Sequence, residues 1–222
     1  SIDGMLAIGI FSEAQVANLA EISDNIVFLD SAPDELHHNS VVLNFELGIE
    51  QAIDYLLARG HTRIGFLGPN YKLDQKKRPA PEARQQHFIR YMTEKGLFSP
   101  GLLFDTRMTA ESARGLLCAC IQSGSRLPTA LLAANEEMAI GAISAFQEHG
   151  LRIPQDISII SFNDTPLSTL TDPPLTSINT HLDTMSAVAV DLLADWHSAP
   201  RPVPMKVVIP PSLTERGSVA AL

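Results

Sequence analysis

The sequence predicts an α/β protein in which helices cover both faces of a mainly parallel sheet. Short apolar runs of strand length alternate with longer stretches of helical period along the 222 residues. Such alternation is typical of parallel sheets, because each pair of parallel strands needs a crossover that is usually a helix. A glycine closes four of the helical stretches, at Gly60, Gly96, Gly124 and Gly150.

Each expected element has its own local pattern. The strands are short runs dominated by Val, Ile, Leu, Phe and Ala, at residues 5–8, 26–30, 64–67, 102–105, 130–133, 157–162 and 206–209. The helices are longer stretches with apolar residues three or four positions apart, at residues 13–22, 47–59, 82–95, 110–123, 136–149 and 182–196. Residues 70–81 show no periodicity and contain two prolines, so we expect either a surface loop over a site or a tolerated insertion.

Composition excludes several classes of protein. Hydrophobic residues make up 45% of the chain, yet no apolar run approaches the roughly 20 residues of a membrane-spanning helix. The first residues do not resemble a signal peptide, so we expect a cytoplasmic protein with no membrane partner. A net charge of −9 would repel a phosphate backbone, so this segment alone is not expected to bind DNA. Cys118 and Cys120 stand two apart in a helical stretch and are expected to be free.

Polar residues follow several of the expected strands. Asp30, Asn135 and Asn163 each come directly after or at the end of a strand, and Arg84 ends the loop before a helix. Ligands of open α/β sheets bind at the carboxyl ends of the strands. Amides, carboxylates and one arginine can pair with the hydroxyl groups of a polyhydroxylated ligand. The alternative for each residue is a local role, as a turn residue for Asp30 and Asn163 or a helix N-cap for Asn135.

Signals of catalysis or metal binding are weak. The sequence has no glycine-rich phosphate loop, no nucleophile elbow and no metal-binding helix motif. His37 and His38 stand together without a second cluster at ligand spacing, which favours a solvated turn over a metal site. We therefore expect neither an enzyme nor a cofactor.

Six segments, in this order along the whole chain, resemble the LacI/GalR family of transcriptional repressors. The first three are Ile-Asp-Gly-Met-Leu-Ala-Ile at 2–8, Ile-Val-Phe-Leu-Asp at 26–30 and Leu-Leu-Ala-Arg-Gly-His-Thr-Arg-Ile-Gly-Phe-Leu-Gly at 56–68. The others are Pro-Thr-Ala-Leu-Leu-Ala-Ala-Asn-Glu-Glu-Met-Ala-Ile-Gly-Ala at 128–142, Ile-Pro-Gln-Asp-Ile-Ser-Ile-Ile-Ser-Phe-Asn-Asp at 153–164 and Pro-Pro-Leu-Thr-Ser-Ile at 173–178.

The resemblance implies two Rossmann-like subdomains of the periplasmic binding protein type I, with an effector in the cleft between them. An N-terminal subdomain would contain residues 1–42 and 182–207, and a C-terminal subdomain residues 43–181 and 208–222. The family's helix-turn-helix headpiece has no counterpart in this sequence. Neither do the first two βα units of the N-terminal subdomain, which is therefore expected to be incomplete.

The resemblance also assigns effector-binding residues. Arg84 resembles the arginine that clamps the effector, Asn135 an asparagine that contacts it, and Asp30 a sugar-contacting aspartate. Two motifs depart from the family pattern, because Asn163-Asp164 stands where many members have Asp-Asp and Asn135-Glu136 where Asn-Asp is usual. Met108 occupies the position of an aromatic that stacks on the ligand in several members, which argues against purines and leaves sugars. The pattern around Arg84 and Asn163 most resembles regulators of galactoside operons.

The implied function is the effector-binding and dimerisation core of a repressor. A small-molecule effector, expected to be a sugar, would alter the operator affinity of a helix-turn-helix domain outside this sequence. A homodimer would form through the helix at 138–147 and the turn at 167–172, unless the apolar residues of that helix all pack inward. The residues expected at this interface are Ala139, Ile140, Ile143 and Phe146. The rival functions are a periplasmic sugar-binding protein of a transporter and a small α/β enzyme.

Overall fold

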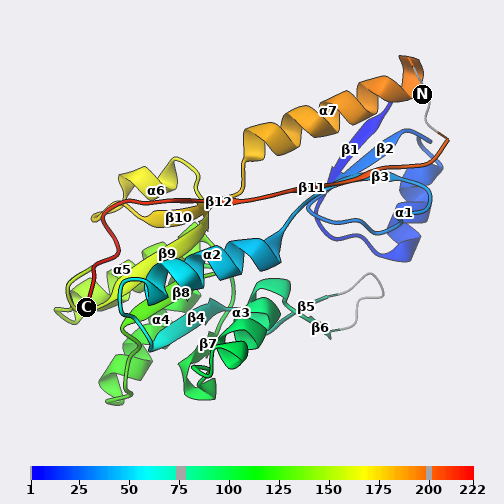
Figure 1. The fold of residues 1–222 in the computed structure, drawn as a ribbon. Helices are drawn as coiled ribbons and strands as arrows, with labels where there is room; N and C mark the ends of the chain where they lie inside the picture. Colours follow the sequence, from blue (N-terminus) through cyan, green and yellow to red (C-terminus); the bar gives the residue numbers. More distant parts are fainter. Residues whose placement is uncertain (1, 74–78, 199–201) are drawn as a thin grey trace. The chain divides into compact units, whose positions relative to one another are not determined.

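A computed structural model describes residues 2–73, 79–198 and 202–222. The chain divides into two compact units (Figure 1). Unit 1 contains residues 1–44, 71–80 and 181–210, and unit 2 contains residues 45–70, 81–180 and 211–222. The chain therefore passes from one unit to the other at residues 44–45, 180–181 and 210–211, among other points. Their identification with the N-terminal and C-terminal subdomains of the family stays a prediction.

Unit 1 is built around a parallel sheet of four strands in the order β1-β2-β3-β11. Its main elements are β1 (Met5–Ile8), α1 (Glu13–Ala20), β2 (Ile26–Leu29), β3 (Asn39–Leu43), α7 (Leu182–Ser198) and β11 (Lys206–Ile209). Phe28 packs in one hydrophobic cluster with Val16 of α1. Val27 packs in another with Met185 of α7. Because neighbouring residues of a strand point to opposite faces, α1 and α7 cover opposite faces of this sheet.

Unit 2 contains a larger sheet of six strands in the order β12-β10-β9-β8-β4-β7. The pairs are parallel except β10 with β12. Its strands are β4 (Ile64–Gly68), β7 (Leu103–Asp105), β8 (Ala130–Ala133), β9 (Ser158–Asn163), β10 (Thr176–Asn179) and β12 (Ser212–Thr214). Its helices are α2 (Phe45–Leu57), α3 (Ala83–Glu94), η1 (Pro100–Leu102), α4 (Ala110–Gln122), α5 (Glu136–Glu148) and α6 (Leu167–Leu170).

The central strands of unit 2 are buried along their whole length, as expected for a sheet covered on both faces. The largest side chains of its core are fully buried phenylalanines, namely Phe66, Phe88, Phe146 and Phe162. β8 and β9 are parallel, and Leu132 of β8 pairs with Ile160 of β9. The carboxyl ends of these two strands therefore lie side by side.

The alternation of strands and helices predicted from the sequence is confirmed. β1, β8 and β11 have the expected bounds. The four helix-ending glycines all have left-handed backbones, with φ of +90°, +71°, +72° and +73° at Gly60, Gly96, Gly124 and Gly150. Outside residues 70–81, three strands were not expected from the sequence, namely β3, β10 and β12.

Two local expectations need correction. Residues 71–73 and 79–81 are not irregular, because they form a two-stranded sheet of β5 (Tyr71–Leu73) and β6 (Pro79–Pro81), while residues 74–78 lie outside the described part. Only one of the two histidines expected in a solvated turn, His37, is in solvent. His37 is exposed, but His38 is buried with its ring packed edge-on against Phe28, at 5.6 Å between centroids. Cys118 and Cys120 are free, as expected.

The last residues of the chain pack on unit 2. The Ser218 hydroxyl accepts a hydrogen bond from the Thr176 amide (2.8 Å) and donates one to the Ile159 carbonyl (2.6 Å). The buried His61 ring donates from Nε2 to the Ala220 carbonyl at 2.9 Å. These contacts tie the C-terminal segment to two central strands and to the loop after α2.

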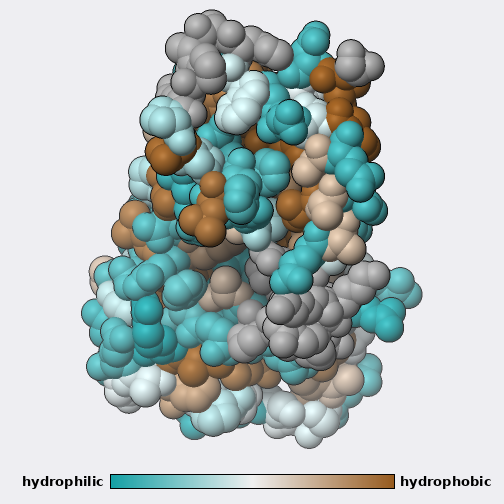
Figure 2. Space-filling view, turned by 90° about the vertical axis from the view of Figure 1, so that its right-hand side faces the viewer, coloured by the Kyte–Doolittle hydropathy of each residue, from teal (hydrophilic) through white to brown (hydrophobic). Residues whose placement is uncertain are grey.

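Exposed hydrophobic side chains occur in both units. On the face shown in Figure 2 they lie in several separate places among hydrophilic ones. Within unit 1, Leu6 and Ile8 of the edge strand β1 are both exposed, and Ile8 is 75% exposed. In the part of the chain that the structure describes, no helix is long and apolar enough to cross a membrane.

Candidate functional site

The carboxyl ends of β8 and β9 place several of the expected residues in one region of unit 2. Asn135 follows β8 and begins α5, while Asn163 is the last residue of β9. Arg84 lies in the first turn of α3, and its Nη1 donates to the carbonyl of Ala134 at 2.6 Å. The structure therefore brings Arg84 next to the residue that precedes Asn135.

Three further contacts hold Arg84 within unit 2. Its Nε donates to the carboxylate of Glu82 at 2.9 Å, and its Nη2 lies 3.8 Å from the sulfur of Met108. The guanidinium also lies over the ring of Phe45, at 5.2 Å from the centroid. The side chain remains 12% exposed. Arg84 is therefore fixed in direction, and N–H groups remain on its terminal nitrogens because a guanidinium carries five donors.

Asn135 has the local role that was the alternative to ligand binding. Its side-chain oxygen accepts from the amide of Met138 at 2.9 Å and caps α5. The cap uses only the oxygen of the carboxamide, so the same orientation leaves the NH₂ group as a donor beside the site. The two interpretations of Asn135 are therefore compatible.

Asn163 and Asp164 both have left-handed backbones, with φ of +98° and +58°. Asparagine and aspartate tolerate this conformation better than most residues. The Asn163 carbonyl lies within hydrogen-bonding distance of the Thr180 amide, at 3.4 Å. The two left-handed residues therefore end β9 and turn the chain out of the strand.

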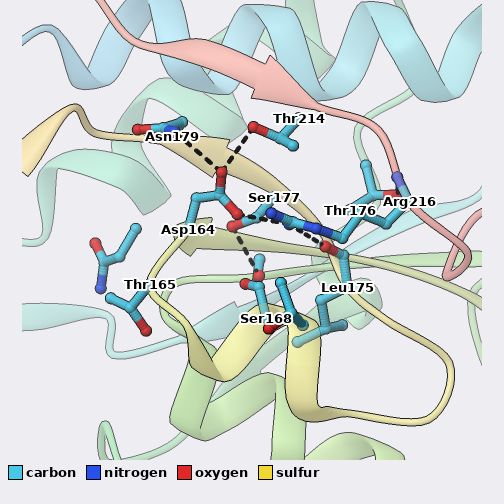
Figure 3. Close-up of polar contacts among 12 residues, drawn as sticks. Asp164, Thr165, Ser168, Leu175, Thr176, Ser177, Asn179, Thr214 and Arg216 are labelled. Atoms are coloured by element: carbon cyan, nitrogen blue, oxygen red, sulfur yellow. Dashed lines mark hydrogen bonds and ion pairs between the residues drawn. The ribbon is translucent and has the colours of Figure 1, made fainter.

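The carboxylate of Asp164 belongs to a polar network, which Figure 3 shows. It accepts hydrogen bonds from Asn179 (3.0 Å) and Thr214 (2.7 Å) and forms an ion pair with Arg216 at 2.5 Å. Arg216 also donates to the Leu175 carbonyl at 2.7 Å. Asp164 thus ties the turn after β9 to β10 and β12, rather than offering its charge to a ligand.

Glu136 fixes the same turn from the other side. Its buried carboxylate accepts from the amide and hydroxyl of Thr165, at 2.8 and 2.6 Å, and from the hydroxyl of Ser168 at 2.5 Å. These partners are neutral donors, and the carboxylate lies in the first turn of α5, where the helix dipole favours negative charge. The glutamate that replaces the usual aspartate therefore links the start of α5 to the segment after Asn163.

Asp30 belongs to unit 1, where it directly follows β2. Its backbone is left-handed, with φ of +66°, and its amide donates to the Val41 carbonyl at 3.0 Å. The residue therefore occupies a sharp turn at the carboxyl end of its strand, in agreement with the local role considered above.

The residues expected at a dimer interface lie mostly in the core of unit 2. Ala139 and Phe146 are fully buried, and Ile143 is 7% exposed. These three side chains pack inward, as the alternative interpretation held, because α5 packs against β8, β9 and α4. Ile140 is partly exposed. The apolar side chains that unit 2 does expose near α5 are Leu167 and Leu170 of α6.

Two contributors to the site were not recognised in the sequence, Glu82 and Phe45. Glu82 precedes Arg84 by two positions, and its buried carboxylate also caps α3 by accepting from the Gln85 amide at 3.1 Å. An acidic residue just before a helix is an N-cap signal, but nothing in the pattern indicates which side chain it pairs with. Phe45 begins α2, about forty residues earlier in the sequence, so only the fold brings it to Arg84.

The arrangement suits hydrogen bonding to a neutral polar molecule. It offers N–H donors of Arg84, the amides of Asn135 and Asn163, and apolar surface from Phe45 and Met108. Within the described residues, no group of three His, Cys, Asp or Glu side chains could hold a metal ion.

Comparison with known proteins identifies the family. Residues 53–219 match the family model of the periplasmic binding protein-like domain. The HTH-type transcriptional regulator GalR of Streptococcus thermophilus is 36% identical over 215 residues, which cover 97% of this chain and 65% of that protein. This chain therefore spans just under two thirds of the length of that relative.

Solved structures show the same fold. A regulatory protein of the LacI family from Chloroflexus aggregans is 27% identical, with a TM-score of 0.83, covering 100% of this chain and 78% of that one. A LacI family regulator from Enterococcus faecium with bound ribose is 23% identical, with a TM-score of 0.83, covering 100% of this chain and 81% of that one. The chain belongs to the family of periplasmic binding protein-like domains, in the form found in transcriptional regulators of the LacI/GalR type.

Proposed function

We propose that residues 1–222 form the effector-binding core of a cytoplasmic transcriptional repressor whose effector is a sugar. Operator DNA would be bound by a helix-turn-helix domain outside these residues, and the effector would change the affinity of that domain. Similarity to HTH-type regulators over 97% of the chain supports this role over that of a transporter's sugar-binding protein or an enzyme. The acidic chain itself, with a net charge of −9, is not expected to bind operator DNA.

The observation that carries the proposal is the fixed guanidinium of Arg84, which binds the carbonyl of Ala134 at the end of β8, next to Asn135 in the sequence. We place the side-chain amides of Asn135 and Asn163 at the same site because β8 and β9 are neighbouring strands. A planar guanidinium can bridge adjacent hydroxyl groups of a sugar, and each amide supplies a donor and an acceptor group. The ring of Phe45 and the thioether of Met108 offer apolar surface for the C–H face of a sugar. Asp30 remains a proposed effector-binding residue because of the family resemblance.

Calorimetry on the full-length protein tests this proposal with galactose, lactose, glucose, ribose, sucrose and cellobiose. Losing a buried partner of a hydroxyl costs about 1 to 3 kcal/mol, so Arg84→Ala should weaken sugar binding by about ten-fold or more. The matched control is Arg90→Ala on the same helix, where the side chain is exposed and pairs with Glu46. Absence of binding by every sugar would contradict the proposed effector class, and equal binding by Arg84→Ala would contradict the site.

The two asparagines need variants that preserve their local roles. Asn135→Asp keeps an oxygen to cap α5 but removes the NH₂ donor, and Asn163→Gly keeps the left-handed backbone but removes the side chain. Both should weaken sugar binding while the thermal unfolding midpoint stays close to that of the wild type. Unchanged affinity in either variant would remove that residue from the proposed site.

We also propose that the protein forms a homodimer through the surface of unit 2 that includes α6 and Ile140. Leu170 is 78% exposed and Leu167 is 43% exposed, and exposed leucines beside each other favour a contact surface. Sedimentation of the wild type should show a dimer that dissociates in Leu170→Asp. Leu36→Asp, which alters an equally exposed leucine of unit 1, serves as the control. A dimer that persists unchanged in Leu170→Asp would place the interface elsewhere.

A further inference from the structure

The charge of Arg84 is already balanced inside unit 2. The Glu82 side chain is only 4% exposed, and one of its oxygens accepts from Arg84 Nε at 2.9 Å while the other accepts from the Gln85 amide. Arginine commonly binds carboxylate and phosphate groups of ligands. In this chain the protein itself supplies the carboxylate partner of the arginine.

The neighbouring charges do not restore a positive site. Asp164 and Arg216 form an ion pair of their own. Two residues after the carbonyl that Arg84 binds, the carboxylate of Glu136 accepts hydrogen bonds from the neutral donors of Thr165 and Ser168. An anion that approached Arg84 would therefore meet two balanced pairs and one further carboxylate.

We propose that Glu82 is the residue that makes this site select neutral sugars and reject sugars that carry a carboxylate or phosphate group. The inference rests on the proposed sugar-binding function and goes beyond it by naming the charge class of the ligand. Glu82 occupies the edge of the guanidinium at Nε and leaves N–H groups on the terminal nitrogens as donors to hydroxyl groups. A ligand carboxylate would have to compete with a buried carboxylate for the same cation.

Glu82 has a second role as the N-cap of α3, and the experiment must separate the two. Glu82→Gln retains a side-chain oxygen that can cap the helix but removes the negative charge. Glu82→Asp retains the charge on a shorter side chain. The matched control is Glu148→Gln, which removes an exposed carboxylate paired with Arg114. A purely structural role would change stability without changing the preference between neutral and charged ligands.

The test compares ligands that differ only at C6, where a carboxylate replaces the hydroxymethyl group, by calorimetry at low salt. The pairs are galactose with galacturonate and glucose with glucuronate, and inorganic phosphate serves as a probe that does not depend on sugar recognition. Wild type and Glu148→Gln should bind the neutral sugar at least about ten-fold more tightly than its uronate and should not bind phosphate. In Glu82→Gln this preference should fall by about ten-fold or more, and phosphate binding should appear. Glu82→Asp, which keeps the negative charge, should retain the wild-type preference for the neutral sugar over its uronate.

Phosphate binding by Glu82→Gln should disappear again in Glu82→Gln/Arg84→Ala. If it persists, the anion binds elsewhere, for example at the lysines of residues 72–77, and the inference is wrong. Equal preference for neutral sugars in Glu82→Gln and wild type would also overturn it. Failure of the wild type to bind any neutral sugar would instead contradict the proposed function, while the phosphate measurements would still decide the role of Glu82.

Discussion

At the scale of single residues, Gly141 sets how closely α5 approaches α4. A Cβ at this position would meet the carbonyl oxygen of Ala110 and would lie 2.9 Å from the Cβ of Ala113. Backbone atoms of a packed helix cannot move aside without disturbing the pair. We expect Gly141→Ala to lower the free energy of unfolding by about 1 to 3 kcal/mol, measured by urea denaturation.

Gly115 of α4 provides the control for this prediction. A Cβ at that position meets nothing within 4 Å, and the residue is exposed inside a helix. Gly115→Ala should therefore raise stability by about 0.5 to 1 kcal/mol through helix propensity alone. If both variants shifted stability in the same direction, close packing would not be the reason for glycine at position 141.

Single residues also show what could be predicted of the candidate site. The sequence predicted that Asn135 and Asn163 lie at strand ends. Both the length of an apolar run and the polar residues that follow it are local features of the sequence. The partnership of Glu82 with Arg84 was not predicted, since it depends on which acidic side chain turns inward. The burial of Ala139, Ile143 and Phe146 was equally hidden, because an apolar helix face does not reveal whether it meets its own core or a partner.

At the scale of elements, β1 is an edge strand with apolar side chains in solvent. Leu6 and Ile8 lie on the face of the sheet that carries α7, yet both are exposed. An apolar edge strand with unpaired backbone groups is prone to pair with another chain. We expect Ile8→Lys to reduce concentration-dependent light scattering of this chain without lowering its unfolding midpoint.

The control for the edge strand is Leu36→Lys. Leu36 is more exposed than Ile8 but lies in the turn before β3, away from any strand. It should leave the scattering unchanged. Equal suppression by both variants would attribute the effect to net charge rather than to the strand edge.

Two of the strands that sequence patterns missed, β3 and β10, have buried polar side chains. β3 begins with Asn39 and Ser40, which are both buried, and β10 contains Thr176 and Ser177, which are fully buried. The Ser177 hydroxyl accepts a hydrogen bond from the Ser161 hydroxyl at 2.9 Å, so polar side chains satisfy each other inside the sheet. Hydrophobic periodicity cannot detect such strands, whereas β8, with four consecutive apolar residues, was predicted with its bounds.

At the scale of the whole molecule, each unit contains one buried histidine whose pKa lies below the usual value of 6.5. Burial lowers the pKa of His61 in unit 2, and the charge of Arg59 lowers it further, while the hydrogen bond to Ala220 raises it. Burial also lowers the pKa of His38 in unit 1, with Asp34 opposing the shift. Both native units therefore favour the neutral imidazole.

A lowered native pKa makes the unfolded chain bind more protons than the native protein as pH falls below about 6.5. The contribution of these histidines to stability should therefore be constant above neutral pH and should decline on acidification through the window between their unfolded and native pKa values. Urea denaturation at pH 8 and pH 5.5 should show this loss, and His61→Gln should reduce it. At pH 8 the His61 imidazole is neutral, so the difference in unfolding free energy between wild type and His61→Gln at this pH measures the packing lost in the variant. An unchanged difference between the two pH values in His61→Gln would show that other groups govern the acid response.

The repeated passage of the chain between the units has a consequence for biosynthesis. Unit 1 needs β11 and unit 2 needs β12, and both strands come from the last seventeen residues, 206–222. Protein domains generally fold in the order in which they leave the ribosome. Here that order cannot apply, because neither unit has all its strands until residues 206–214 have been synthesised. A ribosome that stalls near residue 200 would hold two incomplete sheets at once, so the nascent chain should depend on chaperones until residues 206–214 have emerged.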